Sequence, residues 1–346
     1  MLNSKKHLAR SVLLAATLSL PLAACSSAAD GGSTGAGTEG GAGSESQMAE
    51  ALPASCSVDN PVIGVSLPDT TNPYYVSMQA GFVETGTAAG FDIKMAIADD
   101  DDAMQLSQID SFIQQDVCAV ALNPVSSGPS AAIVAKLNAA GIPVFTVNVL
   151  VSQPDMDKQN AHVVQFVGAD QYQGGEVMAQ AVLEDFGADA EILAGVVGFP
   201  DSVTTNQRDE GFAELLKTNP NAKMGPTVNS KVDPNVSLQV ASDMLQGNPN
   251  MNVIFADTGP GTVGAIQAVK QLGRTGEVAV YGFCASDIVL DSEVYRGCVA
   301  QEPYDYANIT IDNIKKYIGG ESVEGTILRP LVVFTEGQTV GEGLFG

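Results

Sequence analysis

Two adjacent tyrosines at the start of a predicted helix are the residues of this sequence best suited to hold a ligand. Residues 62–67 are apolar and largely β-branched, which predicts a buried strand, and a polar turn follows them. Asn72 and Pro73 then favour a helix start, because asparagine can accept hydrogen bonds from the first free amides and proline fits the first helical position. Asn72, Tyr74 and Tyr75 are therefore expected at the carboxyl end of a strand, where open α/β sheets bind ligands. The alternative is a helix cap beside two ordinary core aromatics.

Together with Asn72, short hydrogen-bonding side chains mark the ends of most of the predicted strands. They are Asn123, Asn148, Asp257, Thr258, Cys284 and Gln301. Any one of them can be a turn former, but their recurrence in both halves of the chain predicts a ligand site at the carboxyl ends of the strands. Arg208 is a further candidate, because it is one of few cations and its planar guanidinium suits contact with adjacent oxygens. Its alternative is a surface ion pair with Asp209 or Glu210.

The elements that must position these residues alternate between short strands and helices. We expect strands over residues 62–67, 92–98, 118–122, 143–147, 163–167, 191–197, 223–228, 252–256, 278–283, 297–301 and 331–334. We expect helices over residues 73–87, 104–115, 130–139, 172–186, 205–218, 236–246, 262–271 and 306–318. This alternation is typical of parallel sheets with helices on both faces. About 285 such residues exceed one typical domain, so the predicted fold is α/β with two doubly wound, Rossmann-like lobes.

The first 24 residues have the features of an export signal. Three basic residues precede an apolar run that is too short to span a bilayer, and a small-residue cleavage site follows. The Leu-Ala-Ala-Cys sequence that ends at Cys25 resembles the lipobox of bacterial lipoproteins, which implies cleavage before Cys25 and diacylation of its sulfur. The alternative is a plain signal peptide with a chance cysteine. Residues 25–60 are expected to be the acylated cysteine and a flexible linker, which would leave the protein lipid-anchored on the extracytoplasmic face of the cell membrane.

Charge and composition exclude several classes of function. The chain has 16 basic and 40 acidic residues, a net charge of −24, and loss of residues 1–24 with three of the basic residues would make it −27. Such a charge repels phosphate backbones, so no nucleic-acid partner is expected. One histidine, His162, would remain, and neither clustered metal ligands nor a hydrolase motif is present. We therefore expect no metal, no cofactor and no enzymatic activity.

Two further motifs have competing interpretations. Residues 259–264 match GxGxxG between a strand and a helix, as a dinucleotide fingerprint requires. The next strand ends in Cys284 rather than an acidic residue that could bind a ribose, so we favour a glycine-rich turn. The acidic run 99–102 could attract a cation, but it lacks calcium-loop spacing, and a solvated helix start explains it better.

The four cysteines after Cys25 are expected to form two disulfides, as is usual in exported proteins. Cys56 leads into the first strand and Cys118 begins the third, and these strands are neighbours if the sheet order is 2-1-3. Cys284 and Cys298 lie on successive strands of the other lobe. The predicted pairs are Cys56–Cys118 and Cys284–Cys298; if Cys284 is free instead, it lines the ligand pocket.

From about residue 61 to 334, the chain resembles the ribose-binding-protein branch of the type I periplasmic binding proteins, the solute-binding subunits of ABC importers. The matching segments are Asn72-Pro73-Tyr74-Tyr75, Leu122-Asn123-Pro124, Gly141-Ile142-Pro143-Val144, residues 207–212, Gly282-Phe283 and Ala300-Gln301. The resemblance implies that Tyr74 and Tyr75 sandwich the apolar faces of a ligand. It also implies that Asn72, Asn123, Arg208 and Gln301 hydrogen-bond ligand hydroxyls.

Three departures from the family pattern affect the expected ligand. Asn148-Val149 stands where sugar-binding relatives usually have Asp-Arg, Cys284 stands where they have Asp, and Thr258 stands where Asn is common. These changes remove charged groups that grip a pyranose, so a smaller or less polar solute such as a polyol or deoxy-sugar becomes plausible.

The resemblance also implies the organisation and the partners of the chain. The N-terminal lobe would comprise residues 61–168 and 303–330, and the C-terminal lobe residues 169–302 and 331–346, with a hinge at three crossings. A monomer would close on a small sugar or polyol and deliver it to an ABC permease and its ATPase. The alternatives are a receptor subunit for a chemotaxis or sensor-kinase system, and an extracytoplasmic enzyme.

Overall fold

The computed structural model describes residues 46–47, 51–187, 189–286 and 288–346. The predicted export signal, Cys25 and most of the predicted linker lie outside these residues. Among the helices in the described ranges, none combines the length and the apolar character that crossing a bilayer requires.

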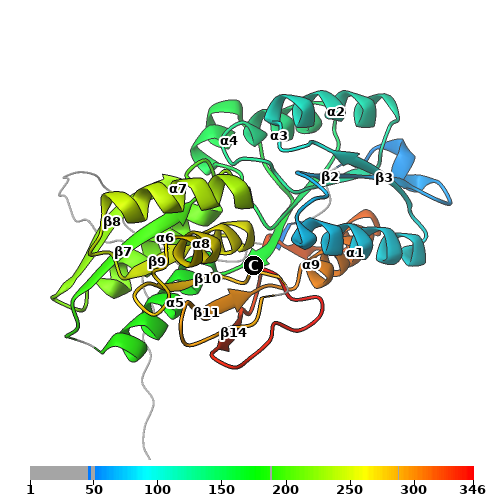
Figure 1. Ribbon diagram of the computed structural model, residues 1–346. Coiled ribbons are helices and arrows are strands. Elements are labelled where there is room, and N and C mark those ends of the chain that lie inside the picture. The colour runs from blue at the N-terminus through cyan, green and yellow to red at the C-terminus, as the bar shows by residue number, and fades with distance from the viewer. Residues whose placement is uncertain (1–45, 48–50, 188, 287) are drawn as a thin grey trace, which may run out of the picture. The chain divides into compact units, whose positions relative to one another are not determined.

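The first of two six-stranded sheets takes five strands from the N-terminal half of the chain and one from near its C-terminal end. Its strands are β2 (Val62–Leu67), β3 (Asp92–Ile97), β4 (Ala119–Leu122), β5 (Val144–Val147), β6 (Gln165–Ala169) and β13 (Thr326–Arg329). They pair in the order β13-β6-β5-β4-β2-β3, and all of these pairs are parallel. Helices α1 (Pro73–Ala89) and α9 (Pro303–Ile318) pack on one face. Helices α2 (Asp102–Gln114), α3 (Ser130–Ala139) and α4 (Gln153–Gln159) cover the other face (Figure 1).

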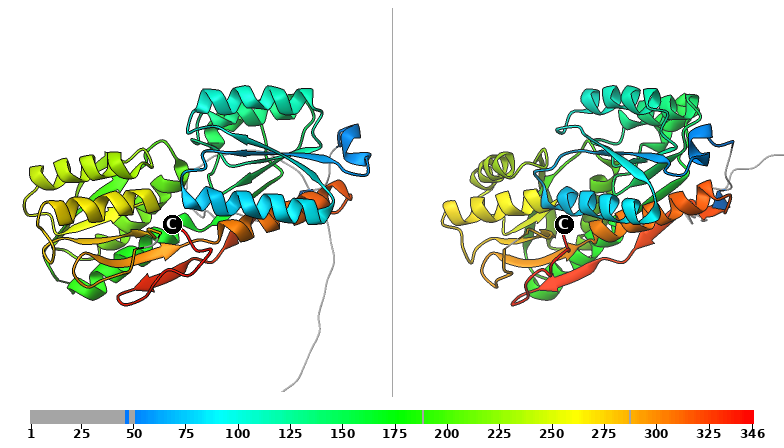
Figure 2. Two further views of the ribbon diagram at one scale, coloured as in Figure 1. Left: turned by 45° about the vertical axis from the view of Figure 1, so that its right-hand side comes forward. Right: turned by 90° about the vertical axis from the view of Figure 1, so that its right-hand side faces the viewer.

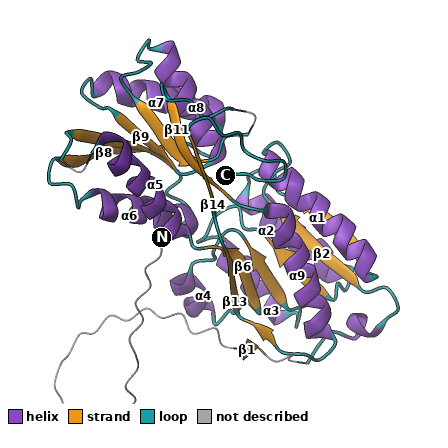
Figure 3. Cartoon of the chain, turned by 90° about the horizontal axis from the view of Figure 1, so that it is seen from below, coloured by secondary structure: helices purple, strands orange, loops and turns teal. Residues whose placement is uncertain are grey.

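The second sheet has the same plan with one reversed edge. Its strands are β7 (Ile192–Gly198), β8 (Ala222–Asn229), β9 (Val253–Ala256), β10 (Ala279–Phe283), β11 (Tyr295–Ala300) and β14 (Val332–Thr335), in the order β14-β11-β10-β9-β7-β8. Strand β14 runs antiparallel to its neighbour, β11, and the other pairs of this sheet are parallel. Helices α5 (Gln171–Phe186) and α6 (Val203–Leu216) cover one face, and α7 (Pro234–Gly247) and α8 (Gly259–Gln271) cover the other (Figure 3). The predicted pair of doubly wound α/β lobes is confirmed.

The chain passes between the two sheets three times, after β6, after β11 and after β13. Figure 2 shows α9, in orange, beside α1, in cyan-blue, on one face of the first sheet. Both predicted disulfides are present: Cys56–Cys118 with a Cα–Cα distance of 4.7 Å, and Cys284–Cys298 with one of 4.9 Å. Each bridge joins segments that pack around the same sheet, so neither ties the two sheets together.

All expected strands and helices are present, with bounds that differ by up to three residues. Several helices begin earlier than expected because they start at or beside a proline, as α7 and α9 do, and proline suits the first helical turn. The sequence interpretation missed α4, β13 and a small two-stranded sheet of β1 (Ser46–Gln47) and β12 (Val323–Glu324).

Part of the predicted linker therefore belongs to the folded body. Strand β1 pairs with β12, and the 3-10 helix η1 (Ala54–Ser57) carries Cys56, which is bonded to Cys118.

Candidate functional site

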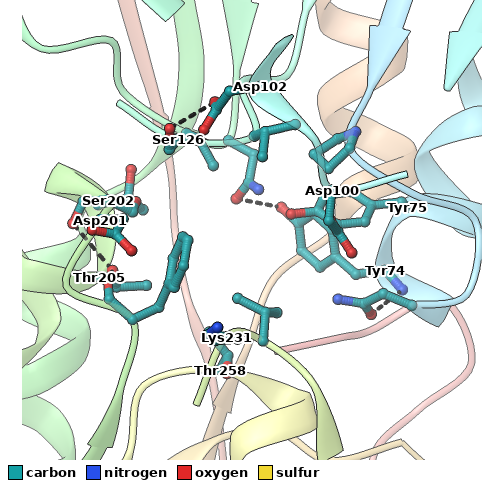
Figure 4. A pocket seen from close by; sticks show the side chains of 18 of the residues that line it. Tyr74, Tyr75, Asp100, Asp102, Ser126, Asp201, Ser202, Thr205, Lys231 and Thr258 are labelled. Atoms are coloured by element: carbon teal, nitrogen blue, oxygen red, sulfur yellow. Dashed lines mark hydrogen bonds between the residues drawn. The ribbon is translucent and has the colours of Figure 1, made fainter. Parts of the chain in front are cut away.

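A cavity of about 580 Å³ lies where the carboxyl ends of the strands of the two sheets face each other. Its volume is within the range of small-molecule sites. Seven of the predicted site residues line it, namely Asn72, Tyr74, Tyr75, Asn148, Arg208, Thr258 and Gln301. The loop after β3 and the start of α1 supply one wall, and the loops after β7, β8 and β9 supply the other (Figure 4).

The loop between β2 and α1 fixes the tyrosine pair through its own hydrogen bonds. Asp69 Oδ1 accepts hydrogen bonds from the amides of Thr71 and Asn72, at 2.6 and 2.7 Å. Asn72 Oδ1 then accepts from the amide of Tyr74 at 3.0 Å and caps the helix, as expected from the sequence. Both tyrosines are buried. These hydrogen bonds fix the first turn of α1 and thereby the positions of the two rings.

The two tyrosine rings form a corner and not a sandwich. Their centroids are 5.4 Å apart and their planes meet at 83°, so no flat ligand fits between them. The expectation of a sandwich within the pair is wrong for this arrangement, because adjacent residues of one helical turn point in different directions. The aromatic side chain that lines the cavity from the second sheet is Phe199, in the loop after β7. Its carbonyl accepts a hydrogen bond from Thr205, and Thr205 lies across the cavity from the tyrosines in Figure 4.

Tyr74 also connects two predicted site residues. Its hydroxyl donates to Asn148 Oδ1 at 2.9 Å. Asn148 follows β5 with a φ of 63°, and this left-handed backbone conformation is tolerated by asparagine better than by most residues. Burial, together with the nearby Tyr306 and Tyr75, raises the pKa of Tyr74 well above its ordinary value, so the hydroxyl keeps its proton and acts as the donor.

Arg208, on α6, is a buried cation held by three contacts. Its Nε donates to Gln171 Oε1 at 2.7 Å, its Nη1 donates to the carbonyl of Asp257 at 2.5 Å, and the guanidinium lies 3.6 Å from the centroid of Phe283. Within the described residues, Nη2 has no hydrogen-bond partner, and the side chain lines the cavity. The interpretation of Arg208 as a surface ion pair is wrong, because the side chain is only 4% exposed.

A relay of amides extends the arginine contact to Gln301, at the end of β11. Gln171 Nε2 donates to Gln301 Oε1 at 3.2 Å, while Gln171 Oε1 accepts from Arg208. Both glutamines are buried, which restricts their rotation. The relay therefore connects Arg208 and Gln301, which both line the cavity, through Gln171.

Two carboxyl groups lie behind Arg208. Burial, followed by the charge of the neighbouring Asp257, raises the pKa of Asp209, and burial likewise raises the pKa of Asp257. Asp257 Oδ2 accepts from the amide of Phe199 at 2.7 Å. The positive charge of Arg208 acts in the opposite direction and lowers both pKa values, but burial is the larger effect, so both carboxyl groups hold their protons more tightly than in water.

Three predicted site residues do not line the cavity. Asn123 is fully buried behind α1, where its amide donates to the sulfur of Met78. Asp257 supports Arg208 and Phe199, as described above. Cys284 is turned away because its sulfur is bonded to Cys298, so the expectation that it contacts the ligand is wrong.

Several lining residues were missed by the sequence interpretation, although they also follow strands. Asp100 and Asp102 follow β3, Asp201 and Ser202 follow β7, and Lys231 follows β8 (Figure 4). The acidic run was expected to be a helix start, and Asp101 does cap α2 by accepting from the amide of Met104. The search for polar residues just after each strand, extended to β3, β7 and β8, would have identified these residues. At the rim, desolvation and the charge of Asp69 raise the pKa of Asp100 to about 6.

The GxGxxG segment serves to pack the start of α8. Thr258 caps this helix by accepting from the amide of Gly261 at 3.2 Å. A Cβ on Gly264 would overlap Ser237 of α7, so this glycine allows the two helices to approach closely. These roles match the favoured interpretation of a glycine-rich turn.

Comparison with known proteins agrees with this geometry. The family model of the periplasmic binding protein domain matches residues 63–322. A ribose import binding protein of Bacillus subtilis is 27% identical over 277 residues, which cover 79% of this chain and 87% of the relative. The D-apiose import binding protein of Actinobacillus succinogenes is 27% identical over 264 residues, which cover 75% and 83%.

A solved structure shows the same fold. It is an ABC transporter solute-binding protein from Agrobacterium vitis bound with α-D-tagatopyranose, with a TM-score of 0.73 and 21% identity, and the match covers 80% of this chain and 95% of that one. Since the family model spans both sheets, the chain belongs to the periplasmic binding protein domain family.

Proposed function

We propose that this protein is an extracytoplasmic solute-binding protein that captures a small sugar, polyol or deoxy-sugar and delivers it to an ABC importer. The observation that carries the proposal is the pairing of aromatic surfaces with hydrogen-bonding groups in one cavity. Tyr74 and Tyr75 line it from the first sheet, Phe199 lines it from the second, and Asn148 and Arg208 are among its polar groups. A sugar ring has apolar faces and hydroxyl edges, and such a cavity matches both.

The family supports this function. The relatives named above are import binding proteins for ribose and for D-apiose, and the chain spans most of their length. Delivery would require an ABC permease and its ATPase as partners. We propose that the protein acts as a monomer, held to the outer face of the membrane by lipid on Cys25.

We further propose that the lobes are residues 61–168 with 303–330, and residues 169–302 with 331–346. The three connections between the sheets would act as the hinge. Hydrogen bonds already join the lobes beside the cavity: Val203 N donates to Ser127 Oγ at 2.8 Å and Leu150 N donates to Thr204 Oγ1 at 2.9 Å.

A thermal-shift screen tests the solute class. The probes are D-ribose, D-allose, D-fucose, D-tagatose, myo-inositol and glycerol, each followed by calorimetric titration if it raises the melting temperature. A ligand at a hundred times its dissociation constant stabilises the folded state by about 2.7 kcal/mol, which is easily measured. If an amino acid or nucleoside raises the melting temperature and none of these probes does, the proposed solute class is wrong.

Substitutions of the aromatic residues that line the cavity locate the binding site. Tyr75→Ala removes a ring face and should weaken binding of the best probe at least tenfold. Tyr304→Phe is the matched control, because its hydroxyl contacts Glu84 on the surface and lies outside the cavity. Equal binding by Tyr75→Ala and the wild type would place the ligand elsewhere.

A further inference from the structure

Residues 341–346 fold back against the carboxyl ends of the second sheet. Phe345 and Gln301 form an antiparallel bridge, in which Gln301 N donates to Phe345 O at 2.6 Å and Phe345 N donates to Gln301 O at 3.0 Å. The amide of Gly259, at the start of α8, donates to Gly346 O at 3.2 Å. In Figure 1 this end of the chain lies among α8, β10 and α9.

The segment also has apolar contacts with the cores of both sheets. Phe345 packs against the cluster that includes Tyr74 and Tyr75, and Leu344 packs against the cluster that includes Cys284 and Cys298. Two main-chain hydrogen bonds to one strand end and two apolar anchors therefore hold the segment in place, and Gly346 lines the cavity.

Gly346 fits its position only because it lacks a side chain. A Cβ there would overlap the amide nitrogen of Cys284 and the carbonyl carbon of Phe283. Gly346 therefore lies against the end of β10. Residue 284 follows this strand, and its side chain would otherwise reach the ligand from there. The disulfide to Cys298 turns that side chain away, and the main chain of Gly346 occupies its place.

We propose that residues 341–346 form a wall of the ligand cavity and help to set its selectivity. This proposal rests on the proposed function. It adds to the ligand site a segment that the polar residues at the strand ends do not reveal. The wall acts in two ways. First, it presents main-chain groups in front of β10, where a side chain would otherwise project. Second, Phe345 holds the main chain of Gln301. The side chain of Gln301 contacts Gln171, which in turn contacts Arg208.

A fluorescence experiment tests the docking of this segment without any ligand. The chain contains no tryptophan, so Phe345→Trp introduces a single reporter. In the folded protein, the introduced indole should emit at short wavelength and be poorly quenched by acrylamide. Adding Gly346→Ala should force the segment away from Cys284, with a red shift and several-fold stronger quenching. Quenching of the parent variant as strong as that of free tryptophan amide would overturn the proposal.

A binding experiment tests the effect on selectivity. Dissociation constants of the sugar and polyol probes are measured for the wild type, Gly346→Ala and Glu342→Ala. Glu342 is the matched control, because it is an exposed residue of the same segment and does not line the cavity. Gly346→Ala should weaken the best probe at least tenfold and change the order of affinities, while Glu342→Ala should stay within twofold of the wild type. Unchanged affinities and order in Gly346→Ala would overturn the proposal.

The two experiments separate this proposal from the proposed function. If no probe binds the wild type, the solute class fails, and the fluorescence result still decides whether the segment covers the end of β10.

Discussion

Replacing Arg208 by lysine tests the role of the buried guanidinium most directly. The substitution keeps the positive charge but removes the planar guanidinium that lies 3.6 Å from the centroid of the Phe283 ring. A single ammonium group also cannot replace the two donors, Nε and Nη1, which the guanidinium holds in a fixed geometry. A buried cation–π contact contributes about 2 kcal/mol, and a hydrogen bond to a charged group contributes about 1.5–3 kcal/mol. If lysine retains one of the two hydrogen bonds and loses the contact with Phe283, the free energy of unfolding should fall by about 3.5–5 kcal/mol.

Ligand binding should change through a different atom. Nη2 of Arg208 has no partner among the described residues and is the donor available to a solute in the cavity. Losing one charge-assisted hydrogen bond costs about 1.5–3 kcal/mol, which is roughly a 10- to 150-fold loss of affinity. Calorimetric titration with the best-bound probe measures this loss, and thermal denaturation measures the change in stability.

Arg296→Lys provides a matched control. Arg296 also pairs with a carboxylate, that of Asp185 at 2.8 Å, and lies near an aromatic ring, that of Phe186, but it does not line the cavity. It should lower the melting temperature slightly and leave the affinity unchanged. If Arg208→Lys binds the probe within threefold of the wild type, Arg208 does not contact the solute. An unchanged melting temperature would contradict the energies assigned to its contacts.

Two further substitutions test the support of the site. Gly175→Ala should lower stability by about 1–3 kcal/mol and weaken ligand binding, because its Cβ would overlap the α6 backbone that carries the arginine. Gly247→Ala, which meets nothing within 4 Å, should be neutral in both denaturation and titration. Asp209→Asn should stabilise the protein at pH 8, by about 2 kcal/mol, and much less at pH 4. Burial and Asp257 raise the pKa of Asp209, so the folded state holds this proton more tightly and wild-type stability falls as pH rises above about 4. If the melting temperatures of Asp209→Asn and of the exposed control Glu210→Gln shift equally at both pH values, this assignment is wrong.

The general plan of the site follows from local sequence signals. An apolar run of strand length followed by Asn72-Pro73 predicts both the end of β2 and the start of α1, and the structure has both at these positions. These features depend on residues close together in the sequence, through hydrogen-bonding caps and fixed proline geometry. The fold class follows in the same way, from repetition of such units.

Which strand-end residues reach the cavity depends on contacts between distant segments. Asn123 and Asn148 look alike in the sequence, since each follows a short apolar strand. Asn148 has a left-handed backbone and accepts from Tyr74, whereas Asn123 is covered by α1 and donates to Met78. The predicted bond to Cys298 removes Cys284 from the cavity, but no local pattern shows that Gly346 fills the space in front of it.

The electrostatics of the cavity favour a neutral solute, although a buried arginine lines it. Asp100, Asp102 and Asp201 line the cavity from loops on both sheets. A sugar phosphate or a sugar acid would gain one contact with the guanidinium but would be repelled by these carboxylates, in a chain whose net charge is −24. A neutral hydroxyl can accept from Nη2 and avoids that repulsion. Arg208 is therefore better understood as a rigid donor to uncharged oxygens than as an anion-binding residue.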